Sequence, residues 1–396
     1  MKIWFLSELY WPSKTSTAFI LTKIAEGVVA DGDVNIGVIT GPPTYDQKHG
    51  EYKLDEVVNS VNILRVRMPY LDKNKLLTRM LRLSYFTLKI AIRALRTIKK
   101  ESIVVAVTTP ISLVLISIFL KKFGNVSRVM LIVHDVYPDN MVVAGLTKKG
   151  GFLYKILDRV FVSAFSKVDT LVVLGRDMKA VLEKKGLSNI NIIENWAEPE
   201  LLCEPALPVS RLERDETVFL MAGNLGRVQG IVKLLDAIDL IHNPSVKFIF
   251  AGDGATGVEV AKRARSTDQI DYLGKYDRDE QAKIFATCDV GVVSLTAGMF
   301  GLAVPSKSYN LMAAGKPLLY IGDPGSELDL VIKETDCGWF CDASSTTAAL
   351  AEYINIVASS TNKEIYDKSR NSYKLGFQKY TEVIATSSFK KLISTI

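Results

Sequence analysis

The stretch Phe219-Leu-Met-Ala-Gly-Asn-Leu-Gly-Arg-Val-Gln-Gly230 decides the fold of the second half of the chain. Its apolar start is typical of a buried strand, its glycines indicate a tight turn, and a helix is expected from about Gly230. Glycines let a backbone approach a phosphate, and the first turn of a helix offers unbonded N–H groups to it. An ordinary glycine-rich turn has the same composition, so this loop alone does not decide a function.

Short apolar runs, each followed by a helical pattern, recur along the whole chain. Continuous Val, Ile and Leu runs are typical of strands buried on both faces of a parallel sheet. The pattern therefore predicts an α/β protein with two doubly wound, Rossmann-like domains. The runs form two groups: Ile3–Leu6, Val34–Ile39, Ile103–Val107, Val129–Val133 and Thr170–Val173, then Val218–Met221, Val246–Phe250, Ile270–Tyr272, Val290–Val293 and Leu318–Ile321.

Prolines and polar residues interrupt both patterns near Asn195–Pro208, where we expect the domain boundary. We place the first domain at residues 1–197 and the second at 198–373, and expect a helix at about 374–396 to pack back on the first. Ligands of open parallel sheets bind beyond the carboxyl ends of the strands. Two such sheets facing each other would form a cleft lined by loops Glu8–Ser16, Gly41–Thr44, Thr108–Pro110, His134–Gly145, Gly223–Gly230, Gly252–Thr256 and Ser294–Lys307.

Composition excludes several classes of site. The 396 residues include four cysteines and three histidines, and no Cys-x-x-Cys pair, so we expect reduced thiols and no His-based metal site. No apolar run is long enough to span a bilayer, and the first residues do not resemble a signal peptide. Residues 1–199 carry 28 Lys and Arg against 18 Asp and Glu, whereas the rest carries 21 against 25. The first half is therefore expected to face something anionic.

A second segment is Val304-Pro-Ser-Lys-Ser-Tyr-Asn-Leu-Met-Ala-Ala-Gly-Lys-Pro317. Ser306 can cap a helix whose first residues include Lys307. A lysine at a helix N-terminus opposes the helix dipole, so its placement makes sense if it shares an anion with the backbone amides. The alternative is a loop lysine in solvent. The particular spacing from Pro305 to Pro317 favours the phosphate role.

These two segments together resemble family 4 of the glycosyltransferases. Gly-Asn-Leu-Gly-x-x-Gln-Gly is followed by Val-Pro-Ser-Lys and Ala-Ala-Gly-Lys-Pro. Tyr10-Trp-Pro-Ser13, His134-Asp-Val-Tyr-Pro-Asp139 and Ile193-Glu-Asn-Trp196 match further family segments, so the resemblance covers nearly the whole chain. It is greatest to the bacterial branch that builds O-antigen and capsule, including L-fucosamine transferase-like proteins.

The resemblance implies the GT-B fold, a nucleoside-diphosphate sugar as donor (UDP-linked), retention at the anomeric carbon, and neither metal nor other cofactor. The charge of the diphosphate would then be neutralised by Arg227, Lys307 and helix amides. The donor-binding residues it implies are Gly223, Asn224, Gly226, Arg227, Gly252, Pro305, Ser306, Lys307 and Asn310.

The same resemblance places His134 near the donor sugar. Asp135 or Asp139 would accept the proton of the acceptor hydroxyl, and the sequence does not choose between them. A structural histidine in a capped loop is the alternative. Glu8, Ser13, Lys14 and Thr15 form a second polar loop on the acceptor side, without the Gly-Gly pair of many relatives.

Some positions depart from the family pattern. Asn224 and Gln229 stand where many members carry an Arg and a Lys in the glycine-rich loop. Asn310 stands in place of a glutamate that usually holds ribose hydroxyls, and an amide can bond hydroxyls without charge. The departures indicate a separate Pro-Ser-Lys branch or a weakened activity. We favour the branch, because loss of function does not predict that Arg227 and Lys307 remain.

The segment Lys73–Lys100 carries nine basic residues and no acidic one, among apolar residues at partly helical spacing. A basic amphipathic helix is typical of membrane-surface binding, although it can also be the solvated face of a core helix. No motif supports nucleic-acid binding. We therefore expect a cytoplasmic protein attached peripherally to the inner face of the cell membrane through Lys75, Arg79, Arg82, Lys89, Arg93 and Arg96.

The sequence thus favours a hexosyltransferase or other glycosyltransferase. It would move a sugar to a lipid-linked or oligosaccharide acceptor in O-antigen, lipopolysaccharide or capsule synthesis. A non-hydrolysing GT-B sugar-nucleotide epimerase and a non-catalytic nucleotide-sugar-binding assembly partner are the alternatives. A dinucleotide oxidoreductase is the weakest, since no G-x-G-x-x-G follows the first strand.

Overall fold

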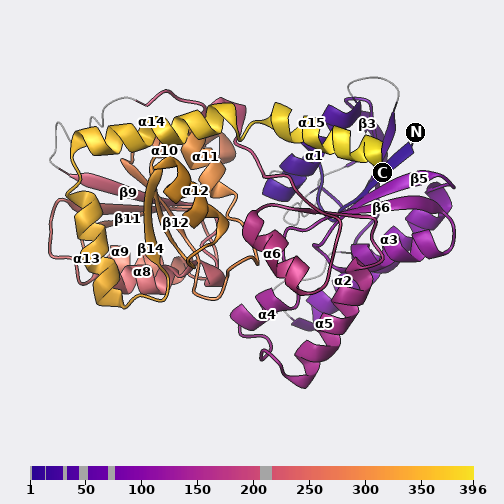
Figure 1. Cartoon of the computed structure of the whole chain (residues 1–396), viewed down its shortest axis with the longest axis horizontal. Coiled ribbons are helices and arrows are strands. Elements are labelled where there is room, and N and C mark those ends of the chain that lie inside the picture. The colour runs from indigo at the N-terminus through magenta and orange to yellow at the C-terminus, as the bar shows by residue number, and fades with distance from the viewer. Residues whose placement is uncertain (1, 14, 30–33, 44–51, 70–75, 206–215) are drawn as a thin grey trace. The chain divides into compact units, whose positions relative to one another are not determined.

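The computed structural model describes residues 2–13, 15–29, 34–43, 52–69, 76–205 and 216–396. The chain forms two compact units, each built around one sheet (Figure 1). Unit 1 comprises Met1–Pro138, Gly150–Glu194 and Val383–Ile396, and unit 2 comprises Asp139–Lys149 and Asn195–Glu382.

Unit 1 contains an eight-stranded sheet in the order β3-β4-β2-β1-β5-β6-β7-β8. All neighbouring strands are parallel except β3 and β4. Every residue of the central strand β5 is buried, as expected for a strand covered on both faces. The strands are β1 (Lys2–Leu6), β2 (Asn35–Thr40), β3 (Asp55–Val58), β4 (Val61–Arg65), β5 (Ser102–Val107), β6 (Val126–Ile132), β7 (Thr170–Val173) and β8 (Ile190–Ile192).

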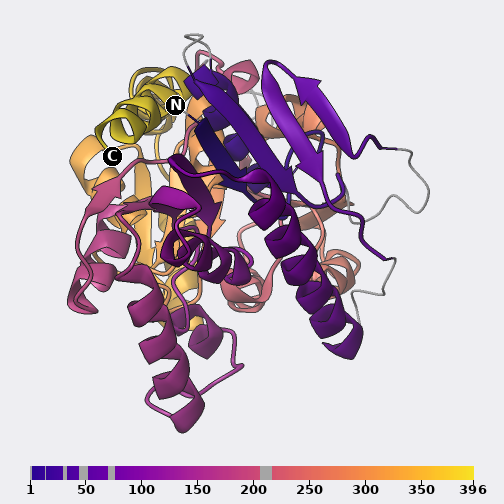
Figure 2. The same ribbon diagram turned by 90° about the vertical axis from the view of Figure 1, so that its right-hand side faces the viewer.

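The hairpin of β3 and β4 corrects the expectation of purely parallel sheets. Asn59 and Ser60 join the two strands with φ values of 48° and 64°. A two-residue loop with both residues in the left-handed region matches the twist of an antiparallel pair. The hairpin lies at one edge of the unit 1 sheet (Figure 2).

The helices of unit 1 cover both faces of its sheet. Crossovers between parallel strands are right-handed, so α1, which leads from β1 to β2, lies on the opposite face from α2, α3 and α5, which lead the other way (Figure 1). On the first face α15 packs against α1, where a Cβ on Gly27 would come within 2.8 Å of Thr386 Cβ. The helices are α1 (Ser16–Val29), α2 (Leu76–Thr97), α3 (Ser112–Lys122), α5 (Phe152–Phe165), α6 (Arg176–Lys184) and α15 (Glu382–Thr395).

Unit 2 contains a six-stranded, wholly parallel sheet in the order β11-β10-β9-β12-β13-β14. The prediction of an α/β fold with two doubly wound parallel-sheet domains is therefore confirmed. Its strands are β9 (Thr217–Ala222), β10 (Val246–Ala251), β11 (Ile270–Gly274), β12 (Val290–Ser294), β13 (Leu318–Gly322) and β14 (Gly338–Asp342). Its α-helices are α4 (Asp139–Val143), α8 (Ile231–Ile238), α9 (Gly257–Ala264), α10 (Gln281–Ala286), α11 (Lys307–Ala313), α12 (Glu327–Thr335), α13 (Thr347–Ala358) and α14 (Asn362–Gln378), and its 3₁₀ turns are η1 (Pro199–Leu201), η2 (Arg227–Gln229) and η3 (Arg278–Glu280).

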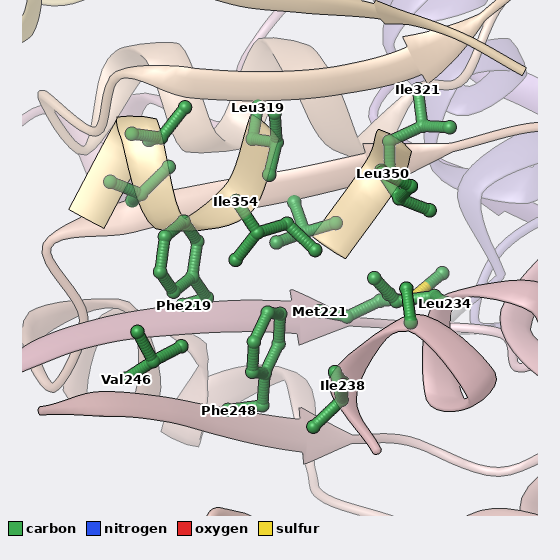
Figure 3. Packing of buried hydrophobic residues seen from close by; sticks show 14 of the residues in the cluster. Phe219, Met221, Leu234, Ile238, Val246, Phe248, Leu319, Ile321, Leu350 and Ile354 are labelled. Carbon is green, nitrogen blue, oxygen red and sulfur yellow. The ribbon is translucent and has the colours of Figure 1, made fainter. Parts of the chain in front are cut away.

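The core of unit 2 fixes the strands that carry the candidate site. Phe219 of β9 and Phe248 of β10 stack with ring centroids 4.9 Å apart, and Leu234 and Ile354 from α8 and α13 join the same cluster (Figure 3). Fully burying a Phe or Leu side chain contributes about 1.5–3 kcal/mol. The carboxyl ends of β9 and β10 are therefore held in place by a tightly packed hydrophobic core.

The C-terminal helical segment divides at the point where the chain changes units. Helix α14 ends at Gln378 and packs on α11, where a Cβ on Gly376 would lie 2.6 Å from Ala313 Cα. Helix α15 follows, and Val383–Ile396 belong to unit 1. Within unit 2, Ala197 N donates to Tyr380 O at 3.0 Å, so the two segments next to the unit boundaries are joined to each other.

Candidate functional site

The glycine-rich loop after β9 has the backbone that its composition predicted. Gly223 and Gly230 have φ values of 106° and 60°, a region that non-glycine residues adopt only at a cost. Between them, η2 (Arg227–Gln229) forms a single tight turn, and α8 begins at Ile231. Asn224 and Arg227 are exposed on this loop. The predicted strand, loop and helix are therefore confirmed.

A second loop, after β10, lies directly against the first. Gly252 and Gly254 have φ values of 133° and 159°, and a Cβ on Gly252 would come within 1.8 Å of Gly223 O. Leu225 N donates to Asp253 O at 2.9 Å, and Thr256 Oγ1 donates to Leu225 O at 2.8 Å. The structure thus brings Gly252 and the glycine-rich loop together, as the sequence predicted.

A third loop, after β12, completes the cluster. Thr296 N donates to Val228 O at 2.9 Å, which joins this loop to the first. The Asp323 carboxylate, from the loop after β13, accepts hydrogen bonds from Gly298 N at 3.0 Å and Phe300 N at 2.7 Å. The sequence does not predict Asp323 as a site residue, because nothing in its sequence neighbourhood shows that it folds against a loop 23 to 25 residues earlier.

Lys307 adds a half-buried cation to this cluster, besides the exposed Arg227. It is the first residue of α11, as predicted, and its Nζ donates to Gln229 Oε1 at 3.1 Å. Burial lowers the pKa of the Lys307 ammonium to about 8, because its charged form loses water. Its hydrogen-bond partner Gln229 is a neutral amide, which does not compensate the charge. An anion bound here would do so.

The predicted cap at Ser306 is wrong. Ser306 has helical dihedrals, φ −61° and ψ −24°, and its side chain makes no capping hydrogen bond. A capping serine needs an extended backbone for its oxygen to reach the amides of the first turn. Instead, Ser308 Oγ donates backward to Pro305 O at 2.7 Å, so Pro305 accepts the bond that fixes the start of α11.

Asn310 binds a residue that the sequence did not indicate. Its Nδ2 donates to Glu198 Oε1 at 2.9 Å, and its Oδ1 accepts from Glu198 N at 3.1 Å. Arg278 Nε donates to the other oxygen of the same carboxylate. Asn310 therefore fastens α11 to the segment that enters unit 2. No spacing signal could have found Glu198, since it lies 112 positions away in the chain.

His134 follows β6 in unit 1. Thr108 Oγ1 accepts hydrogen bonds from His134 N at 3.1 Å and Asp135 N at 3.3 Å, and Thr109 Oγ1 donates to Asp135 Oδ2 at 3.2 Å. Within the described residues His134 Nε2 is buried and has no hydrogen-bond partner. Burial lowers the pKa of His134 to about 4, so the imidazole is neutral at pH 7.

Asp139 is grouped differently from Asp135. It starts α4, and the segment Asp139–Lys149 belongs to unit 2, whereas Asp135 belongs to unit 1. Val143 of α4 reaches the third loop of unit 2, since a Cβ on Gly298 would lie 3.8 Å from Val143 Cγ2. The two candidate aspartates, Asp135 and Asp139, therefore belong to different units.

The polar loop after β1 is held by its own unit. Arg82 of α2 forms an ion pair with Glu8 at 3.7 Å, and Gly41 N donates to Glu8 O at 3.2 Å. Ser13 N donates to Tyr10 O, and Thr15 Oγ1 accepts from Ala18 N at the start of α1. Lys14 lies outside the described residues.

The cations of α2 point largely to partners within unit 1. Besides Arg82, Arg93 Nη2 bonds Asp55 Oδ1 at 2.6 Å, and Lys89 Nζ lies 5.2 Å from the centre of its neighbouring Tyr85 ring. Arg96 is exposed. Lys75 and the side chain of Arg79 lie outside the described residues. Among the helices the structure describes, none is both long and apolar enough to cross a membrane.

Comparison with known proteins identifies the family. Residues 206–374 match the family model described as glycosyl transferases group 1. The chain is 34% identical over 337 residues to the probable glycosyltransferase WbjE of Pseudomonas aeruginosa, covering 82% of each chain. It is 24% identical over 350 residues to a putative colanic acid biosynthesis glycosyl transferase, WcaI of Escherichia coli, covering 83% of this chain and 85% of WcaI.

A solved structure supports the fold over the full length. The crystal structure of HepE from Anabaena in complex with UDP-glucose superposes with a TM-score of 0.69, at 14% identity and complete coverage of both chains. The two sheet units of this chain match the GT-B fold that the sequence resemblance predicts. The chain therefore belongs to the group 1 glycosyltransferases and has their GT-B fold.

Proposed function

We propose that this glycosyltransferase moves a sugar from a nucleoside-diphosphate sugar, UDP-linked, to a lipid-linked or oligosaccharide acceptor in the synthesis of a bacterial surface polysaccharide. The observation that carries the proposal is Lys307, whose partly buried ammonium meets a neutral amide at the junction of three strand-end loops. A bound diphosphate would supply the negative charge that compensates this ammonium.

The donor site would lie on unit 2. The backbone of the glycine-rich loop, its exposed Arg227 and the start of α11 at Lys307 would surround the diphosphate. Charge-assisted hydrogen bonds from Arg and Lys to phosphate are about twice as strong as neutral ones. Support for the nucleotide comes from HepE, whose solved complex contains UDP-glucose. Asn310 would contribute its remaining amide N–H to the donor, without charge.

In the transfer, the bond between the anomeric carbon and the diphosphate oxygen breaks and its electron pair stays on that oxygen. The acceptor hydroxyl oxygen bonds the anomeric carbon and loses its proton. Lys307 and Arg227 would stabilise the leaving diphosphate, where negative charge develops. We further propose retention of the anomeric configuration, which the family resemblance implies.

On unit 1, His134 would contact the donor sugar through its neutral imidazole, and Asp135 would accept the acceptor's proton. The neutral state follows from the lowered pKa of His134, and Asp135 is oriented by Thr109. Glu8 and its loop would face the acceptor. The name of WcaI, which refers to colanic acid biosynthesis, supports a polysaccharide acceptor. An acceptor carried on a lipid would place the enzyme at the inner membrane face.

The test is release of nucleoside diphosphate from a panel of nucleotide sugars, with a membrane extract as the source of acceptor. Wild-type protein should release the diphosphate with one donor, and Lys307→Ala should lose both donor binding and release. Lys262→Ala, an exposed lysine on α9, is the control and should match wild type. Interconversion of the sugar nucleotide without release, or binding without turnover, would contradict the proposal. Undiminished donor binding by Lys307→Ala would overturn the role of that residue.

A further inference from the structure

One face of unit 1 carries an unusual share of exposed apolar side chains. Half of the exposed large hydrophobic residues in the described part of the chain lie on α2, on α3 and its C-cap, or on α5. Monomeric soluble proteins rarely expose apolar side chains in such groups unless the group binds a partner or a membrane. The residues are Met80, Leu81, Leu83, Leu88, Leu95, Leu115, Phe119, Phe123, Phe152, Leu153, Ile156 and Val160.

The exposed residues form a regular stripe on each helix. On α3 and its C-cap they are Leu115, Phe119 and Phe123, four residues apart, and the two rings lie 4.4 Å from each other. On α5, Phe152, Ile156 and Val160 repeat the same spacing. Residues four apart lie above one another on a helix, so each stripe is a continuous outward ridge.

Helix α2 carries a third ridge, in which the exposed residues are seven positions apart instead of four. Leu81, Leu88 and Leu95 are seven residues apart and lie on one side of the helix, whereas Phe86 and Ile90 face the core. The cations Arg82 and Arg93 pair with carboxylates of unit 1, whereas Arg96 is exposed beside Leu95.

The three helices that carry the ridges lie next to one another. Helix α3 contacts both α2 and α5, and all three cover the same face of the unit 1 sheet. Figure 2 shows α2 and α5 extending in the same direction from the sheet. We call the outward sides of these helices the α2–α3–α5 surface.

Positive charge is interleaved with the apolar ridges. Lys122 directly precedes Phe123, and Lys155 and Arg159 directly precede Ile156 and Val160; all three cations are exposed. The only acidic residue in the sequences of α2, α3 and α5 is Asp158, which pairs with Lys185 at 2.5 Å. The surface therefore combines an apolar ridge with cations that no exposed carboxylate on these helices offsets.

We propose that the α2–α3–α5 surface docks on an anionic lipid bilayer. Phe119, Phe123 and Phe152 enter the boundary between headgroups and acyl chains, while Lys and Arg side chains extend to the lipid phosphates. Juxtamembrane Lys and Arg side chains are attracted to the negative surface potential of an anionic leaflet. The charge favours lipid over a protein partner, because the exposed cations beside the ridges are not accompanied by the exposed acidic residues of a mixed protein interface. This inference rests on the proposed function in one respect: docking on the bilayer would bring the donor site close to a lipid-linked acceptor.

Co-sedimentation with phosphatidylglycerol–phosphatidylcholine vesicles, compared with pure phosphatidylcholine vesicles, tests the proposal. Wild-type protein should bind the anionic vesicles, and Phe152→Ser combined with Ile156→Ser should weaken that binding about tenfold. Lys155→Glu combined with Arg159→Glu should weaken the binding to anionic vesicles by a similar factor. This loss should be larger at low salt than at high salt. The control is Val258→Ser on α9, since Val258 and Phe152 are both 83% exposed. It should bind vesicles as wild type does.

Two further measurements separate the alternatives. UDP affinity, measured by calorimetry, should be unchanged in the α5 variants, which separates failure of docking from failure of the proposed donor site. Vesicle binding equal to wild type in both α5 double variants would overturn the proposal. A wild-type dimer that becomes monomeric in Phe152→Ser with Ile156→Ser, without any change in vesicle binding, would show that the surface joins two copies of the chain instead.

Discussion

Lys307 and Gln229 join two loops that lie 78 positions apart in the chain, through a hydrogen bond of 3.1 Å from Nζ to Oε1. The Gln229 amide oxygen serves as the acceptor that orients the Lys307 ammonium. The glycine-rich loop and the start of α11 therefore act together, and the charge of the site is concentrated on Lys307 and the exposed Arg227.

The first prediction concerns the partner of Lys307. Gln229→Glu places a carboxylate beside the ammonium, which neutralises it internally and repels an incoming diphosphate. We expect affinity for UDP to fall about 10- to 100-fold, equivalent to about 1.4–2.8 kcal/mol. Calorimetric titration with UDP measures the effect.

The control for this variant is Gln378→Glu, which makes the same chemical change at the exposed end of α14. It should bind UDP as wild type does. Equal UDP affinity in Gln229→Glu and wild type would show that the diphosphate does not lie near this pair.

A second prediction follows from the lowered pKa of Lys307. Its value of about 8 lies below the ordinary 10.5, so between these pH values the unfolded chain holds a proton that the folded chain has released. The free energy of unfolding therefore rises with pH across this window, and at pH 7 the charged lysine destabilises the ligand-free protein. We expect Lys307→Met to raise the melting temperature at pH 7 and to lose UDP binding.

Thermal unfolding at several pH values checks this prediction. The advantage of Lys307→Met should shrink as pH rises from 8 towards 10.5, because the wild-type lysine loses its charge in the folded state. UDP affinity of the wild type should fall over the same range, since the neutral amine no longer attracts phosphate. A variant that is less stable than wild type at pH 7 would contradict the inference that this charge is poorly compensated.

Much of the fold could be predicted because buried parallel strands have a sequence signature of their own. All ten predicted runs coincide with strands. The four that were missed lack that signature. In β3 exposed and half-buried residues alternate, and in β4 buried and half-buried ones. Strand β8 has three residues, and β14 (Gly338–Asp342) contains a glycine and an aspartate. Apolar-run counting does not detect such strands.

The candidate site was less accessible to sequence reasoning. The loops were predicted because glycine and proline mark turns locally, and Lys307 because a cation at a helix start is locally unfavourable. The partners Glu198 and Asp323 act across the fold, and only the strand order brings them to Asn310 and to the Gly298 loop. Pairings of this kind depend on topology and leave no spacing in the sequence.

A third prediction concerns Asp323, which accepts two backbone amides of the loop after β12. Asp323→Ala leaves both N–H groups without their charged acceptor, at a cost of about 1.5–3 kcal/mol for each bond. We expect faster amide exchange in residues 296–302 and weaker UDP binding, because this loop is bonded to the glycine-rich loop through Thr296. Hydrogen exchange read by mass spectrometry reports the loop directly.

Asp342→Ala is the matched control, since Asp342 ends β14 and its carboxylate accepts Ser344 N at 2.7 Å. It should disturb its own turn and leave residues 296–302 protected. Unchanged exchange of residues 296–302 in Asp323→Ala would show that the Asp323 carboxylate does not hold the loop after β12.

The last prediction separates two costs of replacing a glycine. Gly252 and Gly274 both have positive φ, 133° and 68°, but a Cβ on Gly252 would lie 1.8 Å from Gly223 O, whereas none of the surrounding atoms comes within 4 Å of a Cβ on Gly274. Gly274→Ala should therefore cost only the strain of the left-handed backbone, about 1–2 kcal/mol. Gly252→Ala must also displace the glycine-rich loop, because its neighbour is backbone and cannot rotate away. We expect a loss above about 4 kcal/mol or failure to fold.

Gly254→Ala, with its Cβ 2.5 Å from Leu225 O, is the milder variant for measuring UDP affinity. Equal unfolding midpoints in urea for the Gly252 and Gly274 variants would show that Gly252 does not pack tightly against Gly223 O.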